Sequence, residues 1–437
     1  MGHHSHHKAY RDLQVKIDKV HTGYPDTELS RSVLELIFTP EEAEVVSKMP
    51  LRPRTARSIA RRMGRNEAKL TGMLERMADK GLILDLHNPK KDRMYYCVAP
   101  PVVGFVEFTL MRRRQDLDQK ALSEVFDGFF QKGEPFLDQI MGTDTTIGRT
   151  LAHEQTLEPD DMAELLTHDR AADVVRDARS IAVTLCYCRH KSEHLGHPCD
   201  KPMENCMSLN IGADYVTRHS QGKALDTSQA LEILEQSREE GLVYIADNVQ
   251  RRVTYICSCC GCCCGQLQAI NRYGLTNAVK TSAYIADIES SSCTGCGRCA
   301  RRCPIQAIQI HTLPPQIKRK ARMYGKIDES VCLGCGVCKP ACRKQALTMK
   351  RRGERVLTPE GTLERIISMA LEHDRLQNLM FEEEDGLHML LLNRLSGAVL
   401  RMPPVRRALL SDTLKSRFVN FLANGVRGTG GAPNNNM

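Results

Sequence analysis

Apolar and polar residues recur at helical spacing between Thr39 and Gly81. Thr39 precedes Pro40, and Glu42 stands where it can close a capping box, so we expect a helix to begin here. TARSIARRMG and NEAKLTGMLERMADKG predict two more helices, each with a glycine stop. One face of the last helix carries Leu70, Met73, Leu74 and Met77. LILDLH and RMYYCV alternate as strands do around the turn NPKKD, which predicts a helix-turn-helix followed by a hairpin.

The rest of the chain is less regular, apart from one good helix expected from near Thr227 to Gly241. Residues 101–180 are charged and helical in pattern, whereas the closing GTGGAPNNNM has too little apolar surface to order itself. We expect an α+β multidomain chain with these parts: 1–29 flexible leader, 30–100 helix-turn-helix domain with its hairpin, 101–180 helical connector, 181–280 cysteine-rich module, 281–352 repeat domain, and 353–437 helical tail with a disordered end.

Composition restricts the cellular compartment in which we expect the protein and the chemistry that we expect of its cysteines. The 437 residues are 41% hydrophobic, yet no apolar run approaches the roughly 20 residues of a membrane span. The start, MGHHSHHKAY, lacks the apolar core of a secretory signal, so we expect a cytoplasmic protein. Nineteen cysteines in a reducing compartment are seldom disulfides, and their tight spacing predicts metal binding.

The strongest motif is an internal repeat. IESSSCTGCGRCARRCPIQAIQI at 288–310 matches IDESVCLGCGVCKPACRKQALTM at 327–349, and each copy reads CxxCxxCxxxC. The repeat resembles bacterial two-cluster ferredoxins, in which the fourth cysteine of each copy ligates the other cluster. The resemblance implies two 4Fe-4S clusters. Their expected ligands are Cys293, Cys296, Cys299 and Cys342 for the first, and Cys303, Cys332, Cys335 and Cys338 for the second. Zinc is the alternative, because CxxC pairs also build zinc knuckles.

Ten further cysteines lie in the cysteine-rich module: Cys186, Cys188, Cys199, Cys206, Cys257, Cys259, Cys260, Cys262, Cys263 and Cys264. Within YICSCCGCCCG, Cys257, Cys260 and Cys263 recur every third residue, as in the ferredoxin repeat. The interleaved thiols are expected to face elsewhere. We interpret the ten as one or two additional iron-sulfur clusters, one of them using three of the 257–264 thiols and at least one upstream thiol. A zinc site or a thiol-only redox relay is the alternative.

The arrangement of these cysteines resembles a family of 4Fe-4S ferredoxin-type proteins of anaerobes. That family carries a CxCR element, a PC-x-x-P-x-x-x-C element and a CxCCxCCC element before a two-cluster domain. Here the elements are 186–189, 198–206 and 257–264, and the resemblance covers residues 181–350. It implies an iron-sulfur redox protein without identifying its reaction.

Charge suggests partners. The chain has a formal net charge of +8, and residues 293–352 hold fourteen Lys or Arg against two acids. A positive surface favours an acidic redox partner protein. We therefore expect an electron-transfer protein or subunit that relays electrons through its clusters to a partner oxidoreductase, rather than a stand-alone enzyme.

The N-terminal pattern offers a different function. Residues 30–98 resemble a winged-helix domain, and residues 52–76 carry eight basic residues against two acids. The candidate nucleic-acid contacts are Arg61, Arg62, Arg65 and Lys69. The alternative is thus a redox- or oxygen-sensing transcriptional regulator. Winged helices also dock proteins, so DNA is one candidate partner.

Overall fold

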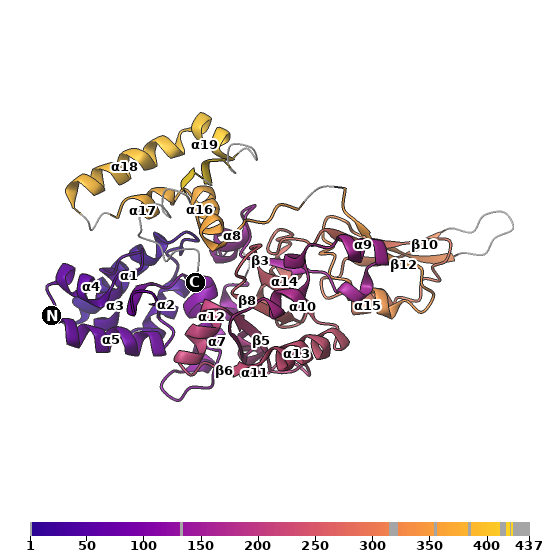
Figure 1. The fold of residues 1–437 in the computed structure, drawn as a ribbon, viewed down its shortest axis with the longest axis horizontal. Helices are drawn as coiled ribbons and strands as arrows, with labels where there is room; N and C mark the ends of the chain where they lie inside the picture. Colours follow the sequence, from indigo (N-terminus) through magenta and orange to yellow (C-terminus); the bar gives the residue numbers. More distant parts are fainter. Residues whose placement is uncertain are drawn as a thin grey trace. The chain divides into compact units, whose positions relative to one another are not determined.

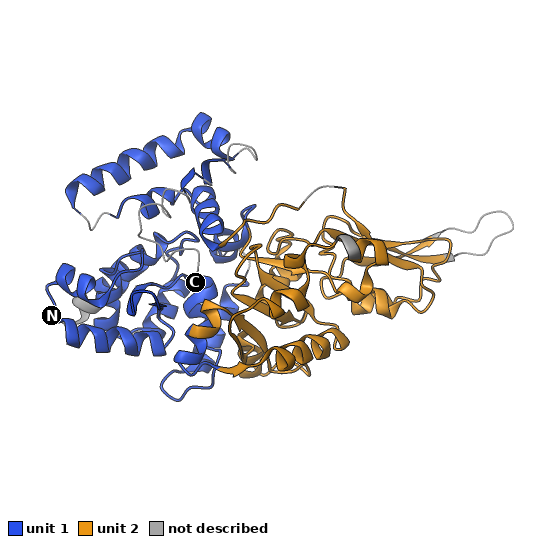
Figure 2. Ribbon diagram, in the orientation of Figure 1, with its two compact units in different colours: residues 1–145, 215–222, 362–437 blue, residues 146–214, 223–361 orange. Residues whose placement is uncertain are grey.

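The computed structural model of the chain describes residues 2–131, 134–313, 322–353, 356–382, 386–410, 417–419 and 421–422 (Figure 1). It divides into two compact units (Figure 2). Unit 1 comprises residues 1–145, 215–222 and 362–437, and unit 2 comprises residues 146–214 and 223–361. Helices and mostly antiparallel strands form separate elements, so the α+β class is confirmed. No described helix is long and apolar enough to cross a membrane.

The described elements of unit 1 are α1 (Gly2–Asp18), α2 (Glu28–Ile37), α3 (Pro40–Ser47), α4 (Ala56–Met63), α5 (Glu67–Asp79), β1 (Ile83–Asn88), β2 (Arg93–Val98), α6 (Val106–Phe108), α7 (Gln119–Gly128), α8 (Phe136–Met141), α16 (Thr362–Glu372), α17 (Leu376–Met380), α18 (Leu387–Arg401) and α19 (Pro403–Leu410). The expected disordered end of the tail lies outside the described residues.

Local sequence signals account for the elements between residues 39 and 98. Thr39 and Glu42 form the expected capping box at the start of α3. Gly64 ends α4 with φ of 62°, a left-handed conformation that suits glycine. The apolar face of α5 is buried as predicted, and β1 pairs with β2 in an antiparallel hairpin. The helices and strands predicted here are confirmed.

The expected flexible leader at residues 1–29 is wrong for its first part, because α1 spans Gly2–Asp18. Leu13 is 0% exposed and Ile17 is 1% exposed, and the helix packs against α3. Burying this apolar pair stabilises the helix through tertiary packing. The histidine-rich start of the sequence concealed the amphipathic pattern that follows it.

A buried histidine joins α5, the hairpin and the segment 215–222 within unit 1. His219 Nδ1 lies 2.5 Å from an Asp79 carboxylate oxygen, and Nε2 lies 3.0 Å from Asp85 Oδ1. Arg218 also pairs with Asp85 at 2.6 Å. Burial lowers the pKa of His219, but the hydrogen bonds to Asp85 and Asp79 outweigh it and raise the pKa above the usual value. The imidazolium is therefore the form that the fold stabilises.

We predict that His219→Gln destabilises unit 1 more at pH 6 than at pH 9. Because the pKa of His219 is higher in the folded than in the unfolded protein, protonation of His219 stabilises the fold. This contribution to the free energy of unfolding is complete below the unfolded pKa of about 6.5 and is lost as pH rises through the folded pKa. The loss at pH 6 should be on the order of 1–3 kcal/mol, as for other charged hydrogen bonds. Thermal denaturation of both proteins at the two pH values measures it. An equal loss at both would contradict the charged form.

The described elements of unit 2 are β3 (Gly148–Leu151), α9 (Pro159–Glu164), α10 (Ala171–Arg176), β4 (Ile181–Leu185), α11 (Tyr187–His194), β5 (Glu204–Leu209), β6 (Gly222–Leu225), α13 (Thr227–Glu239), β7 (Val243–Asp247), β8 (Tyr255–Cys259), α14 (Gly265–Tyr273), β9 (Tyr284–Ile288), α15 (Arg298–Arg302), β10 (Ile308–Leu313), β11 (Arg322–Ile327) and β12 (Leu347–Arg351). Helix α12 (Ile211–Arg218) crosses the division between the units, and β6 begins at its edge.

A six-stranded sheet organises the cysteine-rich module, in the order β3-β7-β8-β5-β4-β6. Helices α10 and α13 contribute to its hydrophobic core with Val175 and Ala230. The sheet is not among the elements expected from the sequence, and β3 lies in the segment 101–180 that was expected to be a helical connector. The reason is that β3 and β7 are buried along their whole length, so their residues show no polar alternation.

The two repeat copies of residues 281–352 are joined by crossed strand pairing. β9 leads into the first copy and pairs antiparallel with β12, which begins at the end of the second copy, and β10 pairs with β11 in the same antiparallel way. Positive φ angles recur at matching positions: Gly295 and Gly334, Gly297 and Gly336, Gln306 and Gln345. The 39-residue repeat of the sequence is thus a structural repeat whose copies depend on each other.

Candidate metal centres

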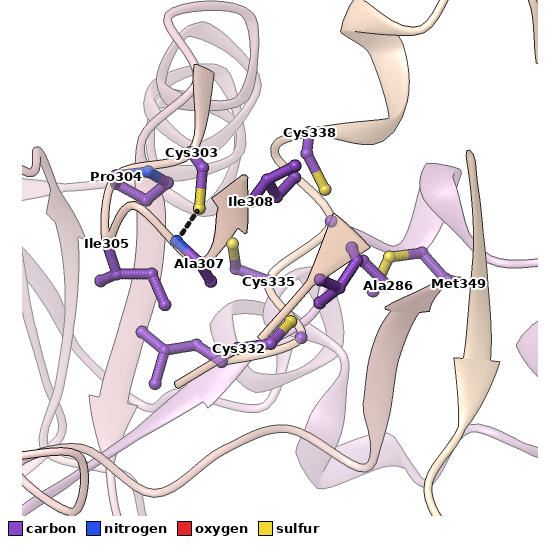
Figure 3. A pocket seen from close by; sticks show the side chains of 14 residues that line it. Ala286, Cys303, Pro304, Ile305, Ala307, Ile308, Cys332, Cys335, Cys338 and Met349 are labelled. Atoms are coloured by element: carbon purple, nitrogen blue, oxygen red, sulfur yellow. Dashed lines mark hydrogen bonds between the residues drawn. The ribbon is translucent and has the colours of Figure 1, made fainter. Parts of the chain in front are cut away.

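Four cysteines of the repeat line one pocket. Cys332, Cys335 and Cys338 come from the second copy and Cys303 from the first. Figure 3 shows their sulfur atoms facing the middle of the pocket. Apolar side chains such as Ile308 complete the lining. These are the four thiols expected to bind the second cluster, and crossed strand pairing brings Cys303 to them.

The pocket favours sulfur bound to metal over free thiolate. Burial raises the pKa of Cys335 to about 12 and that of Cys338 well above its usual value. The Ala307 N–H donates to Cys303 Sγ at 3.3 Å (Figure 3). Iron supplies the positive charge that lets such buried thiols ionise, and amide donors to ligand sulfur are typical of iron-sulfur sites. The residues present therefore fit a cluster.

The other four repeat cysteines also gather together. Cys342, Cys293 and Cys296 act electrostatically on Cys299. The amides of Gly295 and Gly325 donate to Cys293 Sγ at 3.4 and 3.3 Å. Among these four thiols Cys296 is exposed.

Comparison with known proteins agrees with this geometry. A family model described as a 4Fe-4S dicluster domain matches residues 292–346, which contain all eight cysteines of the repeat. No curated protein and no solved structure matches the chain. Residues 292–346 are thus a ferredoxin-type iron-sulfur domain, and together with the remaining cysteine groups they support an iron-sulfur electron-transfer role.

The ten remaining thiols divide into two groups. The first, which we call the tight group, consists of Cys199, Cys260, Cys262 and Cys263, whose Sγ atoms all lie within 4.8 Å of one another. Cys199 Sγ is 3.8 Å from Cys260 Sγ and 3.5 Å from Cys262 Sγ, and Cys262 Sγ is 3.5 Å from Cys263 Sγ. Cys262 is exposed, so the group lies near the surface.

The second group, which we call the thiol ring, consists of Cys186, Cys188, Cys206, Cys257, Cys259 and Cys264. Neighbouring thiols in this group shift one another's pKa values, and these pairs are Cys186 with Cys188, Cys186 with Cys206, Cys206 with Cys257, Cys188 with Cys264, and Cys264 with Cys259. Cys257 and Cys259 share one face of β8 and close the ring. The Gly265 N–H donates to Cys188 Sγ at 3.4 Å.

This grouping differs from the expected set of Cys257, Cys260 and Cys263. Strand β8 ends at Cys259, and the chain then turns before α14 begins at Gly265. A three-residue period cannot continue from a strand, where the side-chain period is two, into a turn. Cys257 consequently faces Cys206 on the neighbouring strand, with which it is in register, while Cys260 and Cys263 join Cys199.

A buried arginine, which the sequence reading did not single out, lies among these thiols. Arg189 is 1% exposed, and its guanidinium donates to Asn205 Oδ1 at 2.5 Å and to the Ser258 carbonyl at 2.9 Å. Burial alone would lower its pKa, but nearby thiols, Cys186 and Cys260 first among them, raise it. A fixed positive charge here offsets thiolate or cluster charge. The sequence feature that marks Arg189 is its position as the last residue of the CxCR element.

Two of the contacts between the cysteine-rich module and the dicluster domain lie beside cysteines of the proposed metal sites. The His153 N–H donates to the Cys335 carbonyl at 3.0 Å, and its Nε2 lies 3.0 Å from the Leu242 carbonyl. Leu242 packs against thiols of both groups. Burial lowers the pKa of His153 to about 4, so this bridge is uncharged near neutral pH.

The second contact involves Gly261, which lies inside the turn of the tight group. The Asn271 amide donates to the carbonyls of Gly261 and Pro304, at 3.4 and 2.9 Å. A side chain at residue 261 would clash with the Pro304 carbonyl oxygen, so only glycine permits this approach. Pro304 follows Cys303, a thiol of the pocket. The turn and the pocket therefore touch through backbone.

The four residues expected to contact nucleic acid have different surroundings. Arg61 and Lys69 are exposed. Arg62 lies 3.9 Å from the Glu382 carboxylate, and Arg65 lies 3.4 Å from Glu41. Acidic side chains of unit 1 thus neutralise part of the basic face.

We predict that Cys335→Ala removes about four iron atoms per chain, because one thiolate of a 4Fe-4S cluster is lost. Iron and protein are to be quantified after anaerobic purification. Cys97→Ala is the matched control, since Cys97 is a buried thiol of the hairpin in unit 1 and should leave the iron unchanged. Unchanged iron in Cys335→Ala would contradict the pocket as a cluster site.

Proposed function

We propose that this chain is an iron-sulfur electron-transfer protein or subunit that relays electrons to a partner oxidoreductase through two ferredoxin-type clusters and at least one further cluster. The first cluster would use Cys293, Cys296, Cys299 and Cys342. The second would use Cys303, Cys332, Cys335 and Cys338. The observation that carries the proposal is that successive sets of thiols within unit 2 are linked to one another by close contacts.

Two structural links connect these sets of thiols. Cys299 of the first set lies close enough to Cys338 of the second to act on it electrostatically. His153 then links Cys335 through hydrogen bonds to Leu242, which packs against the thiol ring and the tight group. A sensor needs one responsive cluster, whereas neighbouring clusters joined by short covalent and hydrogen-bonded paths suit a relay.

The thiol ring is the proposed site of the third cluster. It offers more than the four thiolates that a 4Fe-4S cluster requires, and five of its six cysteines are buried. Arg189 lies beside it as a fixed counter-charge. The Gly265 amide that donates to Cys188 Sγ is the kind of donor found around ligand sulfurs.

The partner is proposed to be acidic and to dock near the first cluster. Cys296 is exposed there, and so are Arg298, Arg343 and Lys344, the last two directly after Cys342. Positive residues around an exposed ligand steer negatively charged partners toward the cluster.

We expect Arg343→Glu combined with Lys344→Glu to slow reduction by an acidic protein donor, such as a reduced flavodoxin, by at least about tenfold at low ionic strength. Reduction by an uncharged small dye should keep its rate. Stopped-flow absorbance measures both. The control is Lys120→Glu, an exposed charge in α7 that is remote in sequence from every cluster cysteine. Equal rates for the double variant and the control would refute docking at this site.

The alternative function is a redox-sensing regulator that binds DNA. It is favoured by the succession of α4, α5, β1 and β2, which has the order of a winged helix, and by exposed Arg61 and Lys69. The ion pairs of Arg62 and Arg65 weigh against it.

If DNA is bound, Arg61→Glu with Lys69→Glu should lower the affinity of the cluster-loaded protein at least about tenfold and reduce its salt dependence. Selection from random duplexes followed by a mobility-shift assay tests this. The regulator is rejected if no selected sequence binds more tightly than random duplex at physiological salt, or if the double variant binds as well as the wild type.

A further inference from the structure

The spacing of the sulfurs in the tight group is that of ligands around one metal ion. With zinc-sulfur bonds of about 2.3 Å, the sulfurs of a tetrahedral tetrathiolate site lie about 3.8 Å apart. The observed separations are 3.8 Å for Cys199 to Cys260, 3.5 Å for Cys199 to Cys262 and 3.5 Å for Cys262 to Cys263. All four sulfurs lie within 4.8 Å of one another, as the corners of a small tetrahedron must.

The dicluster domain gives an internal comparison. In a 4Fe-4S cluster each cysteine binds a different iron at a different corner, so ligand sulfurs stand farther apart than around one ion. Within the described part of the chain, which includes all eight repeat cysteines, the tight group is the one set of three or more candidate ligands packed within 4.8 Å. Neither dicluster set is so compact, and neither is the thiol ring.

Donor chemistry selects the ion. The tight group consists of four thiols, and four thiolates form a closed soft site, which is characteristic of structural zinc. The Asp200 carboxylate lies 3.9 Å from Cys199 Sγ and is not one of the tight group. Four thiolates around a divalent ion leave two negative charges. Arg189 acts electrostatically on Cys260 and supplies one nearby positive charge.

We propose that Cys199, Cys260, Cys262 and Cys263 bind one tetrahedral divalent ion, zinc by its chemistry, and not an iron-sulfur cluster. Binding replaces four S–H protons by four metal-sulfur bonds, releases four protons and involves no electron transfer. The zinc site refines the proposed relay and rests on that proposal in one respect. If the tight group binds zinc, the further cluster of the relay must bind in the thiol ring.

The ion would also hold the turn that contacts the dicluster domain. Cys260 and Cys262 flank Gly261, the residue whose carbonyl shares the Asn271 amide with Pro304. Cys199 lies in the loop between α11 and β5, so the ion ties that loop to the turn. Holding both ends of residue 261 keeps the turn against the backbone that follows Cys303.

The test uses the full chain, produced anaerobically with iron and zinc both supplied and washed with a chelator to remove loosely held metal. Metal analysis of the wild type should give about one zinc per chain. Cys199→Ala with Cys262→Ala should lose that zinc and keep its iron. The matched variant Cys188→Ala with Cys259→Ala, in the thiol ring, should keep the zinc and lose about four irons. Cys97→Ala should keep both metals.

A second readout guards against a variant that fails to fold. Cobalt supplied in place of zinc should give the wild type the visible absorption of a tetrahedral tetrathiolate, and one serine substitution, Cys262→Ser, should shift that spectrum while the iron-sulfur absorption stays unchanged. Wild-type protein without zinc, or a tight-group variant that loses iron instead, would overturn the inference. Iron absent from the thiol ring with zinc still bound would instead remove the third cluster of the relay and leave the zinc site standing.

Discussion

Thiolates gathered in a buried space repel one another, and each also loses the hydration that stabilises its charge. Cys335 shows the size of this effect, since burial raises its pKa to about 12. Positive charge must therefore accompany the sulfurs wherever they ionise. In the dicluster domain bound iron supplies it, whereas in the cysteine-rich module Arg189 contributes a buried fixed charge. Each group of sulfurs in unit 2 therefore needs a source of positive charge beside it if its thiols are to ionise.

Crossed strand pairing satisfies this requirement in the dicluster domain. Neither repeat copy completes a set of four thiols alone, because Cys303 belongs with the second copy and Cys342 with the first. Pairing of β9 with β12 and of β10 with β11 makes each set depend on both copies. In the cysteine-rich module the six-stranded sheet has the corresponding role, since β5 and β8 place Cys206 opposite Cys257.

Much of this could be predicted from the sequence, for identifiable reasons. Thr39, Gly64 and the face of α5 are local signals, and the structure follows them. The repeat is likewise local in sequence, and its spacing carries the chemistry. The sheet could not be found this way, because β3 and β7 are buried on both faces and lack alternation. The partition of the ten thiols depends on which strand neighbours which, as Cys257 and Cys260 show, and spacing contains no such information.

The proposed relay requires several iron-sulfur clusters that lie close enough together to exchange electrons. Iron analysis combined with electron paramagnetic resonance of the fully reduced chain tests it most directly. We expect about twelve irons per chain, from three 4Fe-4S clusters, and signals broadened by magnetic interaction between neighbouring clusters. Fewer than about eight irons, or the sharp signal of one isolated cluster, would contradict it.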